Sequence, residues 1–253
     1  MKQSVVGKVL RSILARRGSI VAPLSPGWQR EREFIADTRS KTRLLLTDPA
    51  ALHILVCARA ARSIPGVFAE AGVFKGGSAR LICEEKGEAP LHLFDVFETQ
   101  QISADDEGEA VRTHFGKIHG AESEVRRLLA GYPGLHFHAG VFPGTACGLE
   151  HLRFSFVHID LDLPDAMAAA LDYFHPRLVP GGILVADDYS DPGVRDRIDF
   201  WLSAEHDTII EMPWSQLMIV RQAQAGLASD SQRRPHRRVE YAIDLESARF
   251  GQI

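Results

Sequence analysis

The chain of 253 residues carries a net charge of −4, and 45% of its residues are hydrophobic and 25% charged. This composition is typical of a globular protein with one domain and appendages, and it argues against nucleic acid as the main partner. No apolar run approaches the roughly 18 residues of a membrane-spanning helix, so we expect a soluble, cytoplasmic protein. Cys57, Cys83 and Cys147 are odd in number and widely spaced, which predicts reduced thiols in the core rather than disulfides or a zinc site.

The first 30 residues contain basic but no acidic side chains, and apolar residues recur at helical spacing between positions 5 and 14. This pattern predicts an amphipathic basic helix that packs on the domain or on a second copy of the chain, which would make a homo-oligomer. An organelle transit peptide or a membrane-surface helix would have a similar pattern. A second helix is predicted from Asp48, as its N-cap, to about Ser63, where Pro65 and Gly66 end it.

Strands and helices alternate from Val67 onward. The pattern predicts strands at 67–71, 91–95, 135–139, 154–160, 183–188, 208–212 and 217–221, and helices at 78–86, 121–130, 164–178 and 192–204, with a short one near 143–150. Parallel strands need such crossovers, so we expect an α/β fold with a doubly wound, mostly parallel sheet of seven strands. Only residues 213–216 separate the last two strands, which predicts a hairpin with one antiparallel strand at the edge of the sheet.

These elements divide the chain into three parts. We expect an N-terminal helical extension over residues 1–64, a main domain over 65–221 and a polar C-terminal tail over 222–253. The acidic segment 98–120 follows the second strand and is either a mobile lid over a site or a solvated connector. The arginine cluster of the tail is expected to be a surface appendage.

A glycine-rich turn follows the first strand. Gly72, Gly76 and Gly77 supply the sharp or left-handed turns that lead into a helix, and Ser78 is the expected N-cap. Free amides at such a helix start can meet the polar end of a ligand, and Glu70 at the strand end can accept hydrogen bonds from it. Close packing of helix on sheet could require the same glycines, so a ligand site and a purely structural turn both remain open.

A nucleoside would fit beside this turn. Asp95 ends the second strand, 19 residues after Gly76, where an acid can hold both hydroxyls of a ribose. Phe97 and Phe142 would flank an adenine, although core packing explains these aromatic residues equally well. The glycine spacing lacks the GxGxxG pattern of dinucleotide sites, which favours S-adenosylmethionine over NAD.

Four carboxylates follow two later strands. Asp160 and Asp162 come after the fourth strand, and Asp187 and Asp188 after the fifth. Burying several carboxylates together costs free energy unless a cation or hydrogen bonds compensate, and oxygen ligands of this kind suit Mg²⁺. The alternative is that Asp187 and Asp188 cap the next helix or that the acids face water.

Five segments carry a family resemblance: GVFKGGS at 72–78, FDVFE at 94–98, AGVFPGT at 139–145, HIDLDL at 158–163 and RLVPGGILVADDY at 177–189. Over about residues 40–220 the chain resembles the macrocin O-methyltransferase family, whose members are metal-dependent sugar and small-molecule O-methyltransferases. The resemblance implies a Rossmann-like class I methyltransferase fold. It also implies that Asp160, Asp187 and Asp188 bind Mg²⁺ and that Asp160 serves as the base.

The resemblance further implies that Glu70, Gly72 and Asp95 contact S-adenosylmethionine, and that Thr42 lies near its methionine end. The family usually carries a Thr-Met pair at this point, whereas this chain has Arg43 after Thr42. A second departure is the segment 163–166, Leu-Pro-Asp-Ala, where the family commonly has a tyrosine and a threonine near the acceptor.

We therefore expect an S-adenosylmethionine-dependent and Mg²⁺-dependent O-methyltransferase acting on a small hydroxylated acceptor, such as a vicinal diol of a sugar. His158 is an alternative base, but its place within the strand is more typical of a core histidine. A cofactor-binding protein without catalysis and an α/β oxidoreductase or nucleotide-sugar enzyme are the other two classes that the sequence leaves open.

Overall fold

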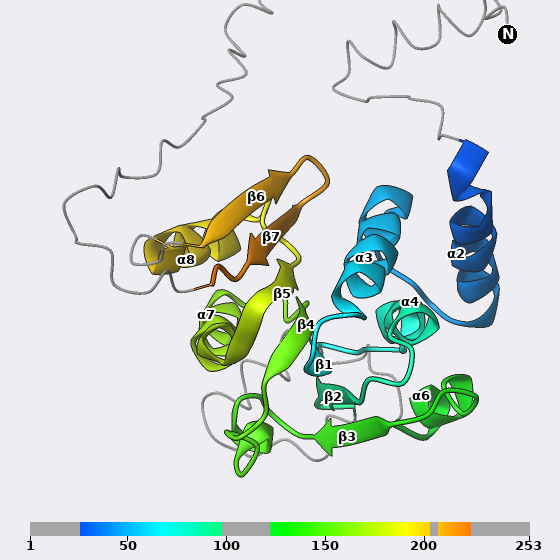
Figure 1. The fold of residues 1–253 in the computed structure, drawn as a ribbon, viewed down its shortest axis with the longest axis horizontal. Coiled ribbons are helices and arrows are strands. Elements are labelled where there is room, and N and C mark those ends of the chain that lie inside the picture. The colour runs from blue at the N-terminus through cyan, green and yellow to red at the C-terminus, as the bar shows by residue number, and fades with distance from the viewer. Residues whose placement is uncertain (1–25, 98–121, 203–206, 224–253) are drawn as a thin grey trace, which may run out of the picture.

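One sheet of seven strands, with helices on both faces, forms the centre of the computed structural model, which describes residues 26–97, 122–202 and 207–223 (Figure 1). The strands are β1 (Val67–Ala71), β2 (Leu91–Asp95), β3 (Leu135–Ala139), β4 (Phe154–Ile159), β5 (Leu178–Ala186), β6 (Thr208–Met212) and β7 (Gln216–Val220). The helices are α2 (Gln29–Lys41), α3 (Asp48–Ala61), α4 (Gly77–Glu85), α6 (Glu122–Leu128), α7 (Pro164–Phe174) and α8 (Pro192–Leu202), with short 3-10 turns η1 (Pro26–Trp28), η3 (Gly144–Ala146) and η4 (His175–Arg177). The predicted α/β fold is confirmed.

The strand order is β3-β2-β1-β4-β5-β7-β6. The first five strands are parallel, and β7 runs antiparallel to both β5 and β6. The predicted hairpin is therefore confirmed, and its antiparallel strand lies inside the outermost strand β6. Strand β5 starts five residues earlier than predicted, because Leu178 pairs with Phe154 before the register shifts.

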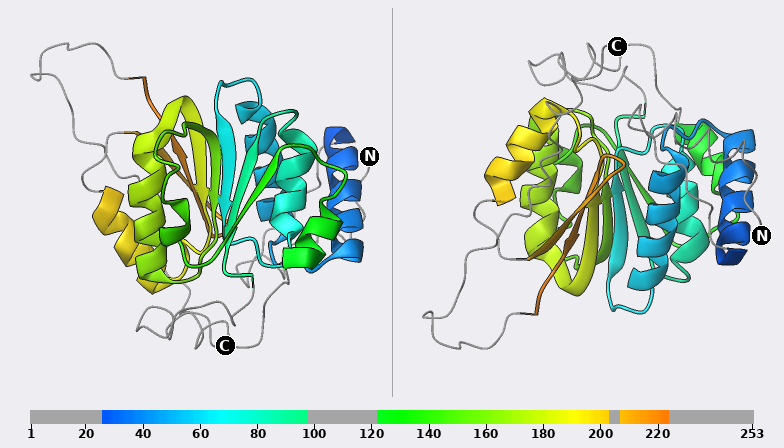
Figure 2. Two further views of the ribbon diagram at one scale, coloured as in Figure 1. Left: turned by 90° about the horizontal axis from the view of Figure 1, so that it is seen from below. Right: turned by 90° about the horizontal axis from the view of Figure 1, so that it is seen from above.

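Helices cover both faces of the sheet (Figure 2), and a hydrophobic core fills the space on each side. Side chains alternate along each strand, so Phe68 and Phe156 face α3 and α4, whereas Ala69 and Val157 face α7 and α8. The Phe68 and Phe156 rings lie 5.3 Å apart and are completely buried. Strands buried on both faces explain the nearly continuous apolar runs in the sequence.

Two helix starts differ from the prediction. Helix α3 is capped by Thr47, whose hydroxyl accepts from the Ala50 amide at 3.4 Å, and Asp48 is the first helical residue. Helix α4 is capped by Gly76 in the left-handed conformation, and the hydroxyl of Ser78 makes no cap. In both cases the chain turns one or two residues before the predicted cap.

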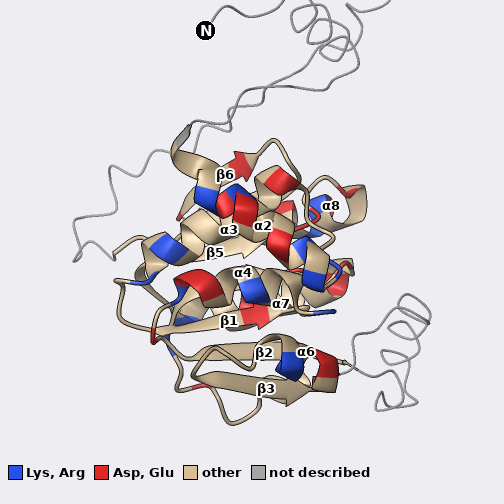
Figure 3. Ribbon diagram, turned by 90° about the vertical axis from the view of Figure 1, so that its right-hand side faces the viewer, with Lys and Arg blue, Asp and Glu red and all other residues tan. Residues whose placement is uncertain are grey.

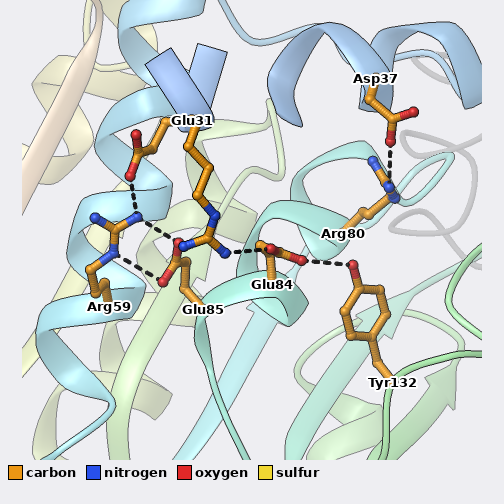
Figure 4. A network of polar contacts seen from close by, with 8 residues as sticks. Glu31, Asp37, Arg59, Arg80, Glu84, Glu85 and Tyr132 are labelled. Atoms are coloured by element: carbon orange, nitrogen blue, oxygen red, sulfur yellow. Dashed lines mark hydrogen bonds and ion pairs between the residues drawn. The ribbon is translucent and has the colours of Figure 1, made fainter. Parts of the chain in front are cut away.

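Helix α2 is an element that apolar periodicity does not reveal. Figure 3 shows charged residues of both signs along α2 and α3, and Figure 4 shows how these charges join the helices to one another. Arg59 of α3 binds Glu31 of α2 at 2.5 Å and Glu85 of α4 at 2.6 Å. Arg80 of α4 binds Asp37 of α2 at 2.7 Å. Ion pairs between segments distant in sequence therefore hold α2 on α3 and α4. They also position the segment 42–47 that follows α2.

Several predictions fall on parts of the chain outside the described residues. They concern the basic helix near residues 5–14 and self-association through it, the segment 98–120 and the tail beyond 223. Among the described helices, none has both the length and the apolar character needed to cross a membrane. None of the three cysteines forms a disulfide, but Cys147 is exposed, so its prediction as a core thiol is wrong. Its place just after η3, in a surface connection, explains this exposure.

Candidate active site

A cavity of about 500 Å³ opens at the carboxyl ends of the five parallel strands β1 to β5. It lies where the strand order reverses between β1 and β4, which is where open α/β sheets bind ligands. Its walls come from the segment 43–47 after α2, the glycine turn, the ends of five strands and the turn between β6 and β7.

The glycine turn serves both the cavity and the packing. A Cβ at Gly72, where φ is +90°, would lie 1.7 Å from the backbone oxygen of Asp160, so no side chain fits there. A Cβ at Gly77 would lie 3.0 Å from Cα of Leu44, so the absence of a side chain at Gly77 lets the segment after α2 pack closely against the start of α4. Gly72, Gly77 and Ser78 also line the cavity. The turn thus brings the ends of β1 and β4 together at the cavity wall.

Asp95 lines the cavity and also holds the glycine turn. Its Oδ2 accepts from the amides of Val73 at 2.6 Å and Phe74 at 2.7 Å, and its Oδ1 accepts from the Phe97 amide at 2.7 Å. Burial raises the pKa of Asp95, although these three amides favour the ionised form. A carboxylate has about four acceptor sites, so Asp95 retains capacity for a ligand hydroxyl.

Five of the nine residues predicted to bind the cofactor line the cavity, namely Gly72, Gly77, Ser78, Asp95 and Phe142. The other four lie behind its wall. The Thr42 hydroxyl donates to the carbonyl of Lys75 at 2.7 Å, and Gly76 packs against Val125. Phe97 is buried against Phe137. Glu70 is completely buried, so its carboxylate does not face the cavity.

Glu70 belongs instead to a buried chain of polar groups beneath the site. His158 lies between two acids, with Nδ1 2.9 Å from Glu70 and Nε2 2.9 Å from Asp187. Burial opposes protonation of this imidazole, but the hydrogen bonds to Asp187 and Glu70 outweigh it and raise the pKa of His158 to about 10. Both ring nitrogens are engaged and the residue is buried, so His158 has the core position that its place in the strand suggests.

The predicted carboxylates converge at the cavity floor. Asp160 shares a group of potential ligand atoms within 4.8 Å with Asp187 and His158, and a second such group with Asp162 and Asp188. Asp162 and Asp188 have positive φ angles of 60° and 58°, a left-handed backbone that costs about 1–3 kcal/mol for such residues. This strained backbone at two strand ends turns both carboxylates toward one another.

The acids of this cluster strongly affect one another. Burial, followed by the charge of Asp187, raises the pKa of Asp160 well above its ordinary value. Burial and the facing carboxyl of Asp162 raise the pKa of Asp188 to about 7. In addition, Oδ2 of Asp188 is buried without any hydrogen-bond partner. The cluster therefore contains more negative charge than the described side chains around it compensate.

Several residues of the cavity wall were not predicted from the sequence, among them Arg43 and Trp214. Arg43 is the one cationic residue among the described residues that line the cavity, and its guanidinium lies 5.9 Å from the centre of the Phe74 ring. Trp214, in the turn before β7, lines the cavity beside the acids and donates from Nε1 to Gln216 at 2.9 Å. The sequence carried a signal for each of them. Arg43 stands where the family usually has the methionine of a Thr-Met pair, and Trp214 is a tryptophan within the predicted four-residue hairpin turn.

Comparison with known proteins gives the family. Residues 49–216 match the family model described as Macrocin-O-methyltransferase (TylF). Over 152 residues the chain is 30% identical to the 8-demethyl-8-(2,3-dimethoxy-alpha-L-rhamnosyl)-tetracenomycin-C 4'-O-methyltransferase of Streptomyces olivaceus. That match covers 54% of this chain and 58% of the relative, so the chain spans little more than half the length of that protein.

Solved structures share the fold at low identity. The O-methyltransferase NovP superposes with a TM-score of 0.58 and 21% identity, covering 68% of this chain and 79% of NovP. The SAH-bound methyltransferase PaMTH1 of Podospora anserina has a TM-score of 0.53 and 14% identity, covering 88% and 98% of the two chains. These structures establish the methyltransferase fold, and the match over residues 49–216 adds that the chain belongs to the macrocin O-methyltransferase family.

Proposed function

We propose that the chain transfers a methyl group from S-adenosylmethionine to a hydroxyl of a small molecule, with Mg²⁺ at the carboxylate cluster. The observation that carries this proposal is the juxtaposition, in one cavity, of the glycine turn and the acids at the ends of β4 and β5. The name of the Streptomyces relative, a 4'-O-methyltransferase for a dimethoxy-rhamnosyl compound, supports a sugar hydroxyl as the acceptor.

The cofactor would lie along the wall formed by the glycine turn and β2. The amides of Gly77 and Ser78 open helix α4 and line the cavity, so they suit the carboxylate of an amino acid. Arg43 adds a cation on the same side. Asp95 suits the ribose hydroxyls, and Phe142 suits the adenine ring by apolar contact.

The acids fit a magnesium ion. Asp160, Asp187 and Asp188 supply the oxygen ligands that Mg²⁺ prefers, and Asp162 lies close enough to share the site. Burial and the neighbouring carboxylates raise the pKa of Asp160 and Asp188; a cation would compensate both effects and would give the unpartnered Oδ2 of Asp188 a partner. His158 is unsuitable as a ligand because both of its nitrogens are already hydrogen-bonded.

When bound, the cofactor supplies an electrophilic methyl group and Mg²⁺ lowers the pKa of the acceptor hydroxyl. The chain must then hold the hydroxyl in line with that methyl group and remove its proton. Asp160 belongs to both groups of potential ligand atoms, so it is placed to accept the proton from the acceptor. Leu163 and Ala166 at the start of α7 line the cavity next to these acids, and their apolar side chains would exclude water around the acceptor.

A thermal-shift titration tests the proposal without the acceptor. S-adenosylhomocysteine should stabilise the protein, and Mg²⁺ should add a second shift; a ligand at 100 times its dissociation constant contributes about 2.7 kcal/mol. Asp188→Asn should lose the Mg²⁺ shift and retain the shift with S-adenosylhomocysteine. Asp196→Asn, on the exposed face of α8, is the matched control and should keep both.

Two results would overturn the proposal. Absence of any shift with S-adenosylhomocysteine would remove the cofactor assignment. Methyl transfer to a diol that continues unchanged in EDTA would remove the metal from the mechanism.

A further inference from the structure

We propose that Gln216 is a positioning residue of this active site, which holds Asp187 in the orientation needed to bind the cation and links it to the cavity wall at Trp214. This inference rests on the proposed function, because it assigns Asp187 to the metal. Gln216 is completely buried at the start of β7 and lines no part of the cavity.

The register of the sheet places Gln216 beside Asp187. Strand β7 pairs with β5 in antiparallel fashion, and Leu217 lies opposite Ala186, the last residue of β5. One step further along both chains, Gln216 and Asp187 come next to each other, and Nε2 of Gln216 donates to Oδ2 of Asp187 at 3.1 Å. The contact therefore follows from the insertion of β7 between β5 and β6.

The neighbours of Gln216 determine which way its amide points. An indole nitrogen can only donate, so the group 2.9 Å from Nε1 of Trp214 must be the amide oxygen. Nδ1 of His53, on α3, lies 2.8 Å from the same oxygen and therefore donates to it as well. With its oxygen saturated by two donors, the amide can present only its NH₂ group to Asp187.

Asp187 is thereby oriented by two donors on a single oxygen. Oδ2 receives the amide of Gln216 and the imidazole Nε2 of His158, and no described residue donates to Oδ1. The free oxygen is thus available for a cation at the cavity, where Asp187 lines the wall. Because an amide carries no charge, Gln216 orients this carboxylate without neutralising it, which a lysine or arginine in its place would do.

The same contacts connect the metal ligand to the cavity wall. Trp214 lines the cavity and its ring lies edge-on to His53, with centroids 5.8 Å apart. Gln216 thus joins three elements, α3 through His53, the β6–β7 turn through Trp214 and the end of β5 through Asp187. If a bound methyl acceptor displaced Trp214, the amide of Gln216 would transmit the movement to the carboxylate of Asp187.

The test replaces Gln216 by methionine, which has nearly the same shape but neither donor nor acceptor of the amide. Mg²⁺ affinity is measured by calorimetry with S-adenosylhomocysteine present, and the affinity for S-adenosylhomocysteine is measured separately without metal. Loss of a residue that orients a metal ligand typically weakens metal affinity by about 10–100-fold. We expect this loss for Gln216→Met, with unchanged binding of S-adenosylhomocysteine. Gln222→Met, the same chemical change at an exposed glutamine after β7, should bind Mg²⁺ like the wild type.

A second variant, Trp214→Phe, keeps an aromatic wall but removes the donor that fixes the amide, and should weaken Mg²⁺ binding by about 3–10-fold. Trp214→Phe tests the role of Gln216 if the Gln216→Met protein does not fold. Wild-type Mg²⁺ affinity in the variants that fold would overturn the role of Gln216 while leaving the proposed function intact. If the wild type itself binds no Mg²⁺, both this inference and the metal assignment fail.

Discussion

Replacing Gly72 by alanine should damage the site through the backbone alone. The new Cβ would lie 1.7 Å from the backbone oxygen of Asp160, whereas Cβ contacts shorter than 3.0 Å are essentially never seen. The ends of β1 and β4 must therefore separate by at least 1.3 Å, the difference between these two distances. Asp160 lies at this junction, and its amide donates to the carbonyl of Ala71 at 2.8 Å. The substitution thus moves the acid that both carboxylate groups share.

The expected magnitudes follow from this geometry. Alanine in a left-handed conformation costs about 1–2 kcal/mol, and a strained or lost hydrogen bond at Asp160 costs about 1 kcal/mol more. We therefore expect the free energy of unfolding to fall by about 2–3 kcal/mol. A shift of about 1 Å in a reacting group can cost about 100-fold in rate, so methyl transfer should fall by at least this factor.

Urea unfolding and the Mg²⁺-dependent thermal shift measure the two effects separately. Gly144→Ala is the matched control, because a Cβ at Gly144 meets nothing within 4 Å and its φ angle is not positive. This control should retain the stability and the Mg²⁺ shift of the wild type. A Gly72→Ala protein that unfolds at the wild-type urea concentration and binds Mg²⁺ normally would refute the assignment of this glycine to the β1–β4 junction.

Three further predictions concern other parts of the chain. Burial, with the neighbouring imidazoles, lowers the pKa of His92 from 6.5 to about 4. The contribution of His92 to stability is therefore complete above pH 6.5 and is lost as the pH falls and the unfolded chain takes up a proton, by about 2 kcal/mol at pH 5. His92→Leu should abolish this loss in urea unfolding, whereas His136→Leu, which removes only one neighbouring imidazole, should reduce it in part. Arg43→Met should weaken S-adenosylhomocysteine binding about tenfold in calorimetry but leave 5′-methylthioadenosine, which lacks the carboxylate, unaffected. Arg59→Met leaves Glu31 and Glu85 buried without their partner and should lower the free energy of unfolding by about 3 kcal/mol, whereas Arg30→Met, at a side chain that is 70% exposed, should change it by less than about 1 kcal/mol.

The sheet could be predicted because its strands are buried on both faces. Segments such as LHLFD at 91–95 and FSFVHI at 154–159 are nearly continuous apolar runs between turn residues, and their bounds match the observed strands closely. Helix α2 could not be predicted in the same way. It is mostly polar, and its contacts with Arg59 and Arg80 join residues 28 and 43 positions apart, a separation to which local periodicity is insensitive.

The acids of the site could be predicted from their place at strand ends, but Glu70 shows the limit of that rule. Glu70 is the last residue but one of β1. It lies two residues after Phe68, on the same face of the strand, so its side chain points toward the α3–α4 layer. There it lies beside His158 in the register of β1 and β4. Asp95 lies on this same face of the sheet, after Leu91 and Leu93, and yet it lines the cavity. Neither the strand end nor the alternation alone therefore decides whether a side chain faces the cavity; Glu70 lies one residue further inside its strand than Asp95.

The environment of Asp187 depends on strand order, which the sequence leaves undetermined. The four residues 213–216 predict a hairpin, but they do not say which of its two strands pairs with β5. If β6 were next to β5, Gln216 would face solvent or another strand, and Asp187 would lose one of the two donors on Oδ2. Because β7 is the inner strand, its first residue, Gln216, lies next to the carboxyl end of β5, beneath the cavity. The orientation of a proposed metal ligand in this chain is therefore a consequence of sheet topology, and substitutions that loosen the β5–β7 pairing should weaken the site without touching any carboxylate.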